Sequence, residues 1–300
     1  MKAKLITIIG LVMSMLTLPV LAESCQNPPS GLISWWRGDN NGDDSWACNH
    51  GILVNGAHYA PGLFGQAIEF DGVNDYFGVP ASTSLSFAPN TEATIEFWYF
   101  SYDSRLPLHF LGKRVACTNA GGFNYQAATD LNLPVTLPNQ WVHWAQVYRT
   151  NGGIALLIYT NGVLRVTING VTFGPQNGVP LKIGTSDNCP NSQSLYGKMD
   201  EIRIYNRALS AAEIVNIVNN KTVPWCGVLQ LTITPIGGNQ VKICWPSRTC
   251  RVYELDYATS LTPPIQWHNL LSDVWGTGNP YCYTDNTGGQ QRFYRVTEYQ

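Results

Sequence analysis

The stretch MDEIRIYNRALSAAEIVNIV (residues 199–218) predicts a β-strand that runs directly into a short amphipathic helix. Its first half alternates β-branched and aromatic residues with polar ones, as half-buried strands do. Ser210 and Glu213 then have the spacing of a capping box, in which the two side chains accept the free amide protons at a helix start. The apolar face of the helix is formed by Ile214, Ile217 and Val218.

Similar short runs of β-branched and aromatic residues recur through the first two thirds of the chain, separated by Gly, Asn, Asp and Pro. They cover residues 31–39, 66–72, 93–100, 140–149, 154–170 and 198–206. Within one of them, Asn161-Gly162 separates two apolar segments, which is a strong signal for a β-hairpin. This pattern predicts an all-β protein built as a two-sheet sandwich.

The pattern changes near residues 223–227, where a boundary between two domains is expected. Beyond it, strand-like runs begin again, and their number and length favour a small immunoglobulin-like or fibronectin-like sandwich. We therefore predict one domain over residues 23–222 and a second over residues 226–300.

The first 22 residues have the composition of a secretory signal peptide. Lys2 and Lys4 precede an apolar run, and small residues near Ala22 suggest cleavage there. The run is too short for a typical transmembrane helix. Lipidation at Cys25 is an alternative that its flanking residues do not favour. A secreted or periplasmic protein, with no membrane insertion after cleavage, is expected.

All eight cysteines lie beyond this segment. An even number in an exported chain indicates disulfides, and no Cys-x-x-Cys pair suggests zinc. The preferred pairing keeps the cysteines of each domain together, although other pairings remain open. It consists of Cys25–Cys48, Cys117–Cys189, Cys244–Cys250 and Cys226–Cys282.

Charge argues against several classes of partner. Charged residues make up 13% of the chain, against roughly 25% in an average soluble domain. The formal net charge is −2, and loss of Lys2 and Lys4 with the leader makes it more negative. No basic field for nucleic acid or an anionic membrane is therefore expected.

Several motifs occur in an order that resembles a known family. The Trp35-Trp36 strand is followed by an Asp/Asn/Gly loop, by Asn-x-Gly-x-Leu at 49–53 and by Phe-Asp-Gly-x-x-Asp-Tyr at 70–76. A later strand contributes Trp141, His143, Ala145 and Tyr148. Over about residues 30–218, the chain resembles the laminin-G-like, concanavalin A-like jelly-roll domains of bacterial secreted proteins.

The tail, residues 228–300, is similar to fibronectin-like modules attached to such domains. The resemblance implies a concanavalin A-like jelly roll followed by a small immunoglobulin- or fibronectin-like sandwich. It also implies that Cys117 and Cys189 lie side by side at one end of the jelly roll. For function it implies recognition of glycans or cell surfaces, which is an analogy based on fold.

A structural calcium ion is the first chemistry that the loops suggest, because calcium takes six to eight oxygen ligands. The resemblance places loop 39–44 beside the strand that carries Asp200, so Asp44 and Asp200 could share one ion. Asp39 and the carbonyl of Asn49 are additional candidate ligands. The alternative is that these residues only cap turns. Because neighbours in a strand alternate, Glu201 is expected to face away from Asp200.

Aromatic rings in or near loops suggest sugar binding, since sugars present apolar faces to rings and hydroxyls to polar groups. The candidates are Trp46, Tyr59, Tyr125 and Tyr196. The alternative for each is packing within the loops. Trp35 and Trp36 should occupy opposite faces of one strand, so at least one belongs to the core.

Catalytic motifs are absent from the sequence: there is no Gly-x-Ser-x-Gly elbow, no His-Glu-x-x-His and no phosphate loop. His143 is interpreted as a packed strand residue rather than a base. The sequence thus predicts a secreted, non-catalytic protein that binds carbohydrate or a cell-surface ligand. Two alternatives remain, a structural or adhesive protein that binds protein partners and a jelly-roll glycoside hydrolase.

Overall fold

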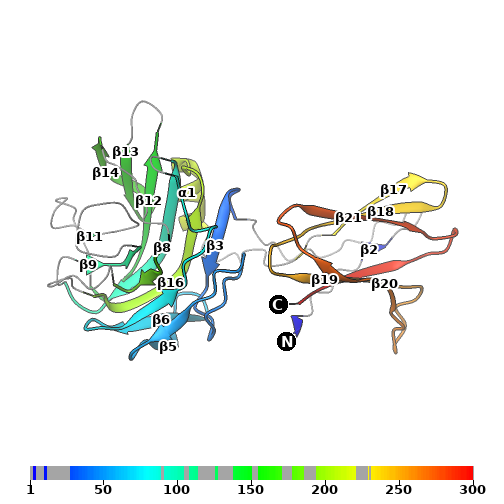
Figure 1. The fold of residues 1–300 in the computed structure, drawn as a ribbon, viewed down its shortest axis with the longest axis horizontal. Helices are drawn as coiled ribbons and strands as arrows, with labels where there is room; N and C mark the ends of the chain where they lie inside the picture. Colours follow the sequence, from blue (N-terminus) through cyan, green and yellow to red (C-terminus); the bar gives the residue numbers. More distant parts are fainter. Residues whose placement is uncertain are drawn as a thin grey trace. The chain divides into compact units, whose positions relative to one another are not determined.

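The computed structural model describes residues 3–4, 10–11, 28–88, 91–104, 108–113, 126–127, 138–150, 155–170, 178–185, 194–220, 229 and 231–299. The chain divides into two compact units. One is Pro28–Thr222, and the other is Val223–Gln300 together with Met1–Asn27. Within the described residues nearly every element is a strand (Figure 1). The predicted all-β class is therefore confirmed.

The first unit contains two main antiparallel sheets. The larger has the order β14-β13-β12-β8-β16-β6-β5, and β3 also pairs with β16. Its strands are β3 (Leu32–Trp36), β5 (His58–Pro61), β6 (Gln66–Asp71), β8 (Ala93–Ser101), β12 (Trp141–Arg149), β13 (Ala155–Thr160), β14 (Val163–Asn169) and β16 (Tyr196–Tyr205). The smaller sheet has the order β10 (Leu111–Gly112), β15 (Leu181–Ile183), β7 (Tyr76–Val79) and β4 (Ile52–Val54). A separate short pair joins β9 (Leu108–His109) and β11 (Gln126–Ala127).

The core of this unit lies between the two sheets and is rich in aromatic rings. The ring of Phe110 lies 5.0 Å from that of Phe97 and 5.5 Å from that of Trp144, centroid to centroid. Trp36 belongs to the same cluster, whereas Trp35 is equally buried outside it. The expectation that the two Trp residues divide between faces is confirmed. We call the side of the larger sheet that faces away from this core its outward face.

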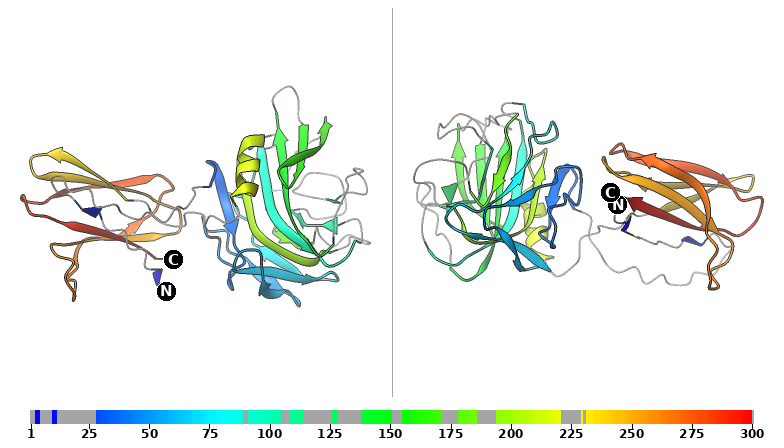
Figure 2. Two further views of the ribbon diagram at one scale, coloured as in Figure 1. Left: turned by 180° about the vertical axis from the view of Figure 1, so that it is seen from behind. Right: turned by 60° about the horizontal axis from the view of Figure 1, so that its bottom comes forward.

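Helix α1 (Ala211–Asn219) lies against part of the outward face (Figure 2). The capping box forms as predicted, with Ser210 Oγ accepting from the Glu213 backbone amide. Ile214 and Ile217 are buried, and the Leu209 amide donates to Thr94 Oγ1 of β8 at 2.9 Å. Among the described residues, no helix is long and apolar enough to cross a membrane.

The second unit is a smaller two-sheet sandwich. One sheet is β17 (Thr232–Gly237), β18 (Gln240–Pro246) and β21 (Pro280–Asn286). The other has β22 (Phe293–Tyr299), β19 (Val252–Ala258) and β20 (His268–Trp275), and β1 (Ala3–Lys4) and β2 (Gly10–Leu11) pair with β22. Residues from both sheets form one core around Trp245, Tyr253 and Tyr294. The strand-like runs expected here correspond to β17, β18, β19, β21 and β22, and none was expected over β20.

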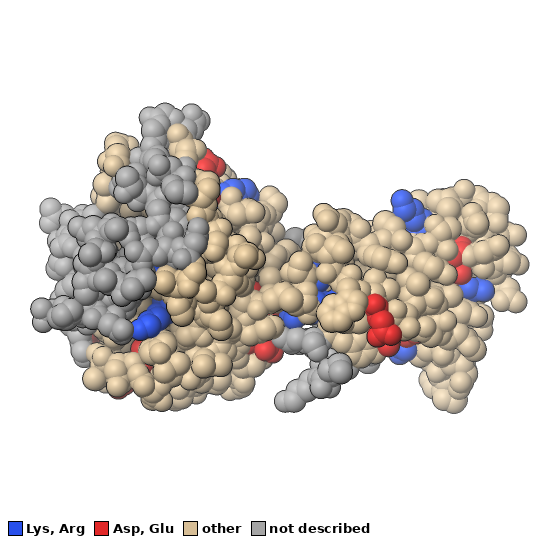
Figure 3. Space-filling view, viewed as in Figure 1, with Lys and Arg blue, Asp and Glu red and all other residues tan. Residues whose placement is uncertain are grey.

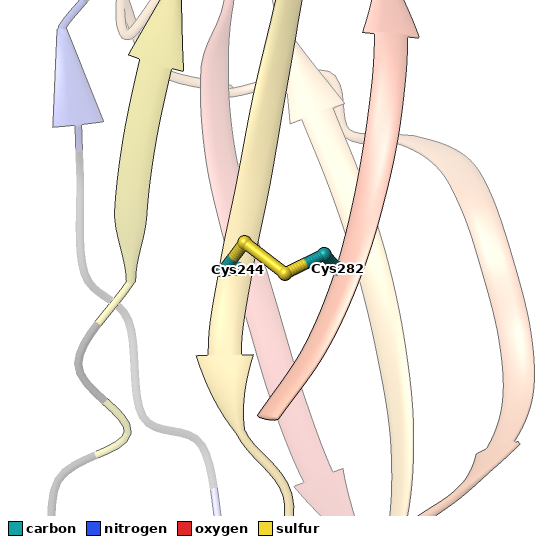
Figure 4. The surroundings of a disulfide bond; sticks show 2 residues. All are labelled: Cys244 and Cys282. Carbon is teal, nitrogen blue, oxygen red and sulfur yellow. A yellow bond between two sulfur atoms is a disulfide. The ribbon is translucent and has the colours of Figure 1, made fainter. Parts of the chain in front are cut away.

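A disulfide in the second unit corrects the predicted pairing. Cys244 and Cys282 are bonded across the neighbouring strands β18 and β21 (Figure 4). The predicted pairs Cys244–Cys250 and Cys226–Cys282 are therefore wrong. The strand register decides the pairing, because it places Cys244 directly opposite Cys282 with their Cα atoms 4.1 Å apart.

Two further cysteines, Cys48 and Cys250, are also disulfide-bonded. The other four cysteines in the predicted pairs lie outside the described residues; they are Cys25, Cys117, Cys189 and Cys226. The pairs Cys25–Cys48 and Cys117–Cys189 stay predictions.

Candidate ligand-binding face of the jelly roll

Asp200 holds the turn at residues 62–66 against the outward face. Its Oδ2 atom accepts hydrogen bonds from the backbone amides of Leu63 and Phe64, both at 2.9 Å. Gly62 leaves room for this contact, because a Cβ there would lie 2.7 Å from Asp200 Oδ2. Burial raises the pKa of Asp200 to about 8. The two hydrogen bonds from the Leu63 and Phe64 amides anchor the turn to this carboxyl group.

A β-bulge places Glu201 on the same side of the sheet as Asp200. Glu201 has φ +55°, and the pairing of β16 with β8 shifts between Asp200 and Arg203. The extra residue lets Met199 and Ile202, three positions apart, both face the core. The expectation that Glu201 faces away from Asp200 is therefore wrong. Glu201 instead accepts the Trp35 indole N–H at 2.9 Å and pairs with Arg203.

Glu201 belongs to a buried ionic cluster with Arg203, Glu96 and His143. Arg203 Nη1 lies 2.8 Å from Glu96 Oε1, and His143 Nε2 lies 2.9 Å from Glu96 Oε2. Burial raises the pKa of Glu96, but Arg203 and His143 outweigh it and the pKa is lowered overall. His143 is a fully buried residue of β12, as interpreted from the sequence. The cluster therefore holds Glu96 ionised beneath the surface.

The 62–66 turn covers this cluster through rings that pack edge to face. Phe64 packs edge-on against Trp98 at 6.5 Å between centroids, and Trp98 packs against His143 at 5.1 Å. The hydrogen bonds from the turn to Asp200 thus fix the cover over His143 and Glu96. The adjacent acids Asp200 and Glu201 have separate structural roles: Asp200 binds the turn, and Glu201 pairs with Arg203 in the cluster.

The predicted calcium ligands already accept hydrogen bonds from nitrogen donors. Asp44 accepts the amides of Trp35 and Trp46 at 2.9 Å and that of Asn49 at 3.2 Å. The Asn49 carbonyl accepts the Trp36 indole N–H at 2.6 Å.

Asp39 Oδ1 accepts the Gln66 amide at 3.2 Å, while Asp200 Oδ1 is buried with no hydrogen-bond partner in the described structure. No group of three or more His, Cys, Asp or Glu side chains in the described parts of the chain is placed to hold a metal. These contacts are those of the turn-capping alternative, and the shared calcium ion stays a prediction.

An open row of side chains crosses the outward face beyond the cluster. Strand pairing places neighbours directly opposite one another on β12, β8, β16, β6 and β5. In this order they are Trp141, Phe100, Lys198, Glu69 and His58. We call this set, with the adjoining Tyr102 and Tyr196, the aromatic row. Its members are partly or largely exposed, with Tyr196 at 38%.

Contacts between the side chains order this row. The rings of Phe100 and Trp141 lie 5.6 Å apart, and those of Tyr102 and Tyr196 lie 5.0 Å apart. The Tyr102 hydroxyl donates to Glu69 Oε1 at 2.6 Å. Burial and this hydrogen bond raise the pKa of Tyr102. The row therefore combines rings with fixed polar groups.

The four aromatic residues predicted to bind sugar do not form one site. Tyr196 belongs to the aromatic row, whereas Tyr59 packs against the core between the sheets. Trp46 is half-buried beside Asp44, and Tyr125 lies outside the described residues. Sequence reasoning missed Trp141, Phe100 and Tyr102. For Phe100 and Trp141 the signal was the alternation within residues 93–100 and 140–149, which places Trp141 and His143 on one face.

The comparisons with known proteins support the jelly roll. The family model of the concanavalin A-like lectin/glucanase superfamily matches residues 82–215. This range contains β8, β12 and β16, which carry most of the aromatic row. A comparison with curated protein sequences finds no match.

Three solved structures show distant likeness. Domain 4 of the extracellular arabinanase AbnA from Geobacillus stearothermophilus, in complex with arabinotriose, is 19% identical; the match covers 62% of this chain and 98% of that one, with a TM-score of 0.47. The binding domain of Paraclostridial mosquitocidal protein 1 is 15% identical; the match covers 75% of this chain and 65% of that one, with a TM-score of 0.45. The botulinum neurotoxin serotype D binding domain is 11% identical; the match covers 81% of this chain and 70% of that one, with a TM-score of 0.48. These likenesses are too distant to indicate a function.

Proposed function

We propose that this protein is a non-catalytic binding protein that recognises a carbohydrate chain through the aromatic row. The observation that carries the proposal is the alignment of rings and polar groups across five neighbouring strands. Sugar rings stack their apolar faces on aromatic side chains, and their hydroxyls bond to carboxylate and ammonium groups. Trp141 and Phe100 supply the first kind of contact, and Glu69 and Lys198 the second.

The length of the row favours a linear ligand. Neighbouring strands lie about 4.8 Å apart, so four intervals from β12 to β5 span about 19 Å. A surface of this length suits several consecutive sugar rings rather than a single one. The aromatic row carries two opposite charges, Lys198 and Glu69, and the described surface in view in Figure 3 has few charged side chains. A largely uncharged polymer therefore fits the row best.

The buried cluster supports a non-catalytic role. A glycoside hydrolase needs two carboxyl groups flanking a cleft that admits the substrate, one of them protonated as the acid. Glu96 and Glu201 are at most 2% exposed, and both pair with Arg203. Their contacts are those of structural ion pairs.

A glycan array probed with the full chain tests the proposal, run in calcium and in EDTA. We expect binding to linear oligosaccharides, with loss of signal in Trp141→Ala and Tyr196→Ala. Trp275→Ala is the matched control, because Trp275 is 69% exposed in the second unit. Equal binding by all variants, or no glycan bound by the wild type, would contradict the proposal. Release of reducing ends would instead indicate a hydrolase.

Binding of a protein partner is the alternative, and one surface favours it. Val163 and Leu164 at the start of β14 are 51% and 46% exposed, and Val215 of α1 is 41% exposed. A Cβ at Gly162 would lie 3.4 Å from Val215, so the hairpin and the helix adjoin. Concentration-dependent self-association in sedimentation experiments, abolished by Leu164→Lys, would support this alternative.

We also propose that the protein works outside the cytoplasm. Disulfides such as Cys244–Cys282 persist in oxidising compartments. The N-terminal sequence of the protein recovered from an exporting host tests this proposal. Glu23 is the expected first residue, so the mature protein would lack β1 and β2. An unprocessed Met1 would contradict it.

A further inference from the structure

The second unit contains a groove that the proposed function does not use. It lies between the turn joining β17 to β18 and the connection from β21 to β22, and its volume is about 390 Å³. The polar residues lining it are Asn239, Gln240, Thr287, Gln290, Gln291 and Arg292.

Four of these side chains are amides with unused hydrogen-bonding capacity. Within the described part of the chain, none of the four forms a side-chain hydrogen bond, and all are exposed. Each carries both donors and an acceptor. The Asn239 amide reaches across to Gly289, where a Cβ would lie 3.7 Å from Asn239 Oδ1. All four residues line the same groove.

The groove carries little net charge. Arg292 Nη1 lies 2.9 and 2.8 Å from the two oxygens of Asp285, and the Tyr294 hydroxyl donates to the same carboxylate at 2.7 Å. The Arg292 guanidinium also stacks over the Tyr257 ring at 4.0 Å. Because this arginine is already paired, the groove favours an uncharged ligand over an anion or a cation.

The two loops that form the groove are joined to each other. The backbone amide and the hydroxyl of Thr287 both donate to the Asn239 carbonyl, each at 2.9 Å. Asn239 has φ +60°, and Gly238 before it also has φ +60°, a region that favours Gly and Asn. A site whose loops are fixed before binding loses less entropy when a ligand binds.

The strand beside the groove is unsuited to bind a peptide. Among the described strands, β17 lies at the edge of its sheet. It contains Pro235, and its register shifts between Pro235 and Gly237. A proline and a bulge both protect an edge against the addition of another strand. An extended peptide would therefore lack a continuous ladder of backbone hydrogen bonds here.

We propose that this groove is a second binding site, for one or two rings of a neutral sugar. Its volume lies in the lower part of the range of about 300–1,000 Å³ for small-molecule sites. An amide offers a donor beside an acceptor, which matches two adjacent hydroxyl groups of a sugar ring. The site lies in the other unit from the aromatic row and would give the protein a second point of attachment to glycans.

Saturation-transfer difference NMR on the full chain tests this inference, with maltose, cellobiose, lactose and mannobiose as probes. The groove variant combines Asn239→Gly with Gln291→Ala, and glycine keeps the left-handed backbone at position 239 without strain. The matched control is Gln266→Ala, an exposed amide outside the groove. A third variant, Trp141→Ala, instead removes one ring of the aromatic row.

We expect at least one disaccharide to bind the wild type and to bind the groove variant at least about tenfold more weakly. Gln266→Ala should keep the signal. The groove substitutions should weaken binding by the same factor in the Trp141→Ala background, where the contribution of the aromatic row is reduced. Loss with Trp141→Ala but not with the groove variant would assign the binding to the aromatic row and overturn this inference. Failure of all four probes to bind the wild type would overturn it as well. Thermal melting verifies that each variant is folded.

Discussion

Two neighbouring regions on the outward face of the larger sheet are built from the same strands but differ in their cover. In β12, His143 and Trp141 lie two residues apart and face the same way, yet His143 is fully buried and Trp141 is partly exposed. In β8, Glu96 is fully buried, while Phe100 is partly exposed. The turn at 62–66 covers the first region and leaves the second open. The cover, more than residue type, separates a structural cluster from a candidate binding surface.

Removal of the central arginine of the covered cluster should have the largest effect. Arg203→Met leaves Glu96 and Glu201 buried without their shared cation. Breaking a buried pair in this way costs about 3–5 kcal/mol of unfolding free energy. Urea unfolding measures the loss, with the exposed Arg165→Met as control, expected to change stability by less than about 0.5 kcal/mol. A loss below about 1 kcal/mol would show that the cluster is accessible to water.

A change in the open region should affect binding more than stability. Trp141→Ala removes a ring of the aromatic row, and we expect glycan affinity to fall about tenfold or more. Its urea midpoint should shift much less than that of Arg203→Met, because Trp141 lies at the margin of the sheet. Titration calorimetry and urea unfolding of the two variants make the contrast quantitative. Equal losses of stability would remove the distinction between the two regions.

Much of the fold could be predicted because its signals are local. The capping box of Ser210 and Glu213 and the Asn161-Gly162 hairpin each depend on a few adjacent residues, and both form as expected. Strand β20 escaped prediction because its pairing with β19 is irregular and Asp273 has φ +57°. Regular alternation, the main signal of a strand, is lost there.

The candidate sites depend on contacts that the sequence does not encode locally. The bulge at Glu201 uses a left-handed residue that is neither Gly nor Asn, so no turn signal marks it. The Cys244–Cys282 disulfide and the aromatic row both arise from strand register. Register is set by the packing of whole sheets, and a single sequence gives it only after the strand order is known.

The ion pair at the start of α1 tests how burial changes the strength of a charge pair. Arg207 and Glu213 are about one third exposed, and the Arg207 hydrogen bond lowers the pKa of Glu213 to about 2. This lowered pKa stabilises the fold above pH 4.5, the usual pKa of the group, and the contribution is lost as pH falls from there towards 2. Because the pair is partly exposed, we expect it to contribute only about 1 kcal/mol to the free energy of unfolding.

Urea unfolding between pH 5 and pH 2 should therefore show a steeper loss of stability in the wild type than in Glu213→Gln. The two curves should converge at the acid end, where Glu213 is protonated in both folded and unfolded states. Parallel curves over the whole range would show that the pair contributes nothing to the pH dependence.

Calcium should have the smallest effect on stability. The carboxylate of Asp44 accepts three backbone amides, and that of Asp200 holds the 62–66 turn. An ion bound only by the folded state adds RT ln(1 + [L]/Kd) to the unfolding free energy, so a tight site would raise the melting temperature clearly. We expect EDTA and 5 mM calcium to give melting temperatures within about 1 °C of each other, and Asp44→Ala to destabilise equally in both. A calcium-dependent rise of several degrees, abolished by Asp44→Ala, would support the calcium prediction and show that the loop at 39–49 rearranges around the ion.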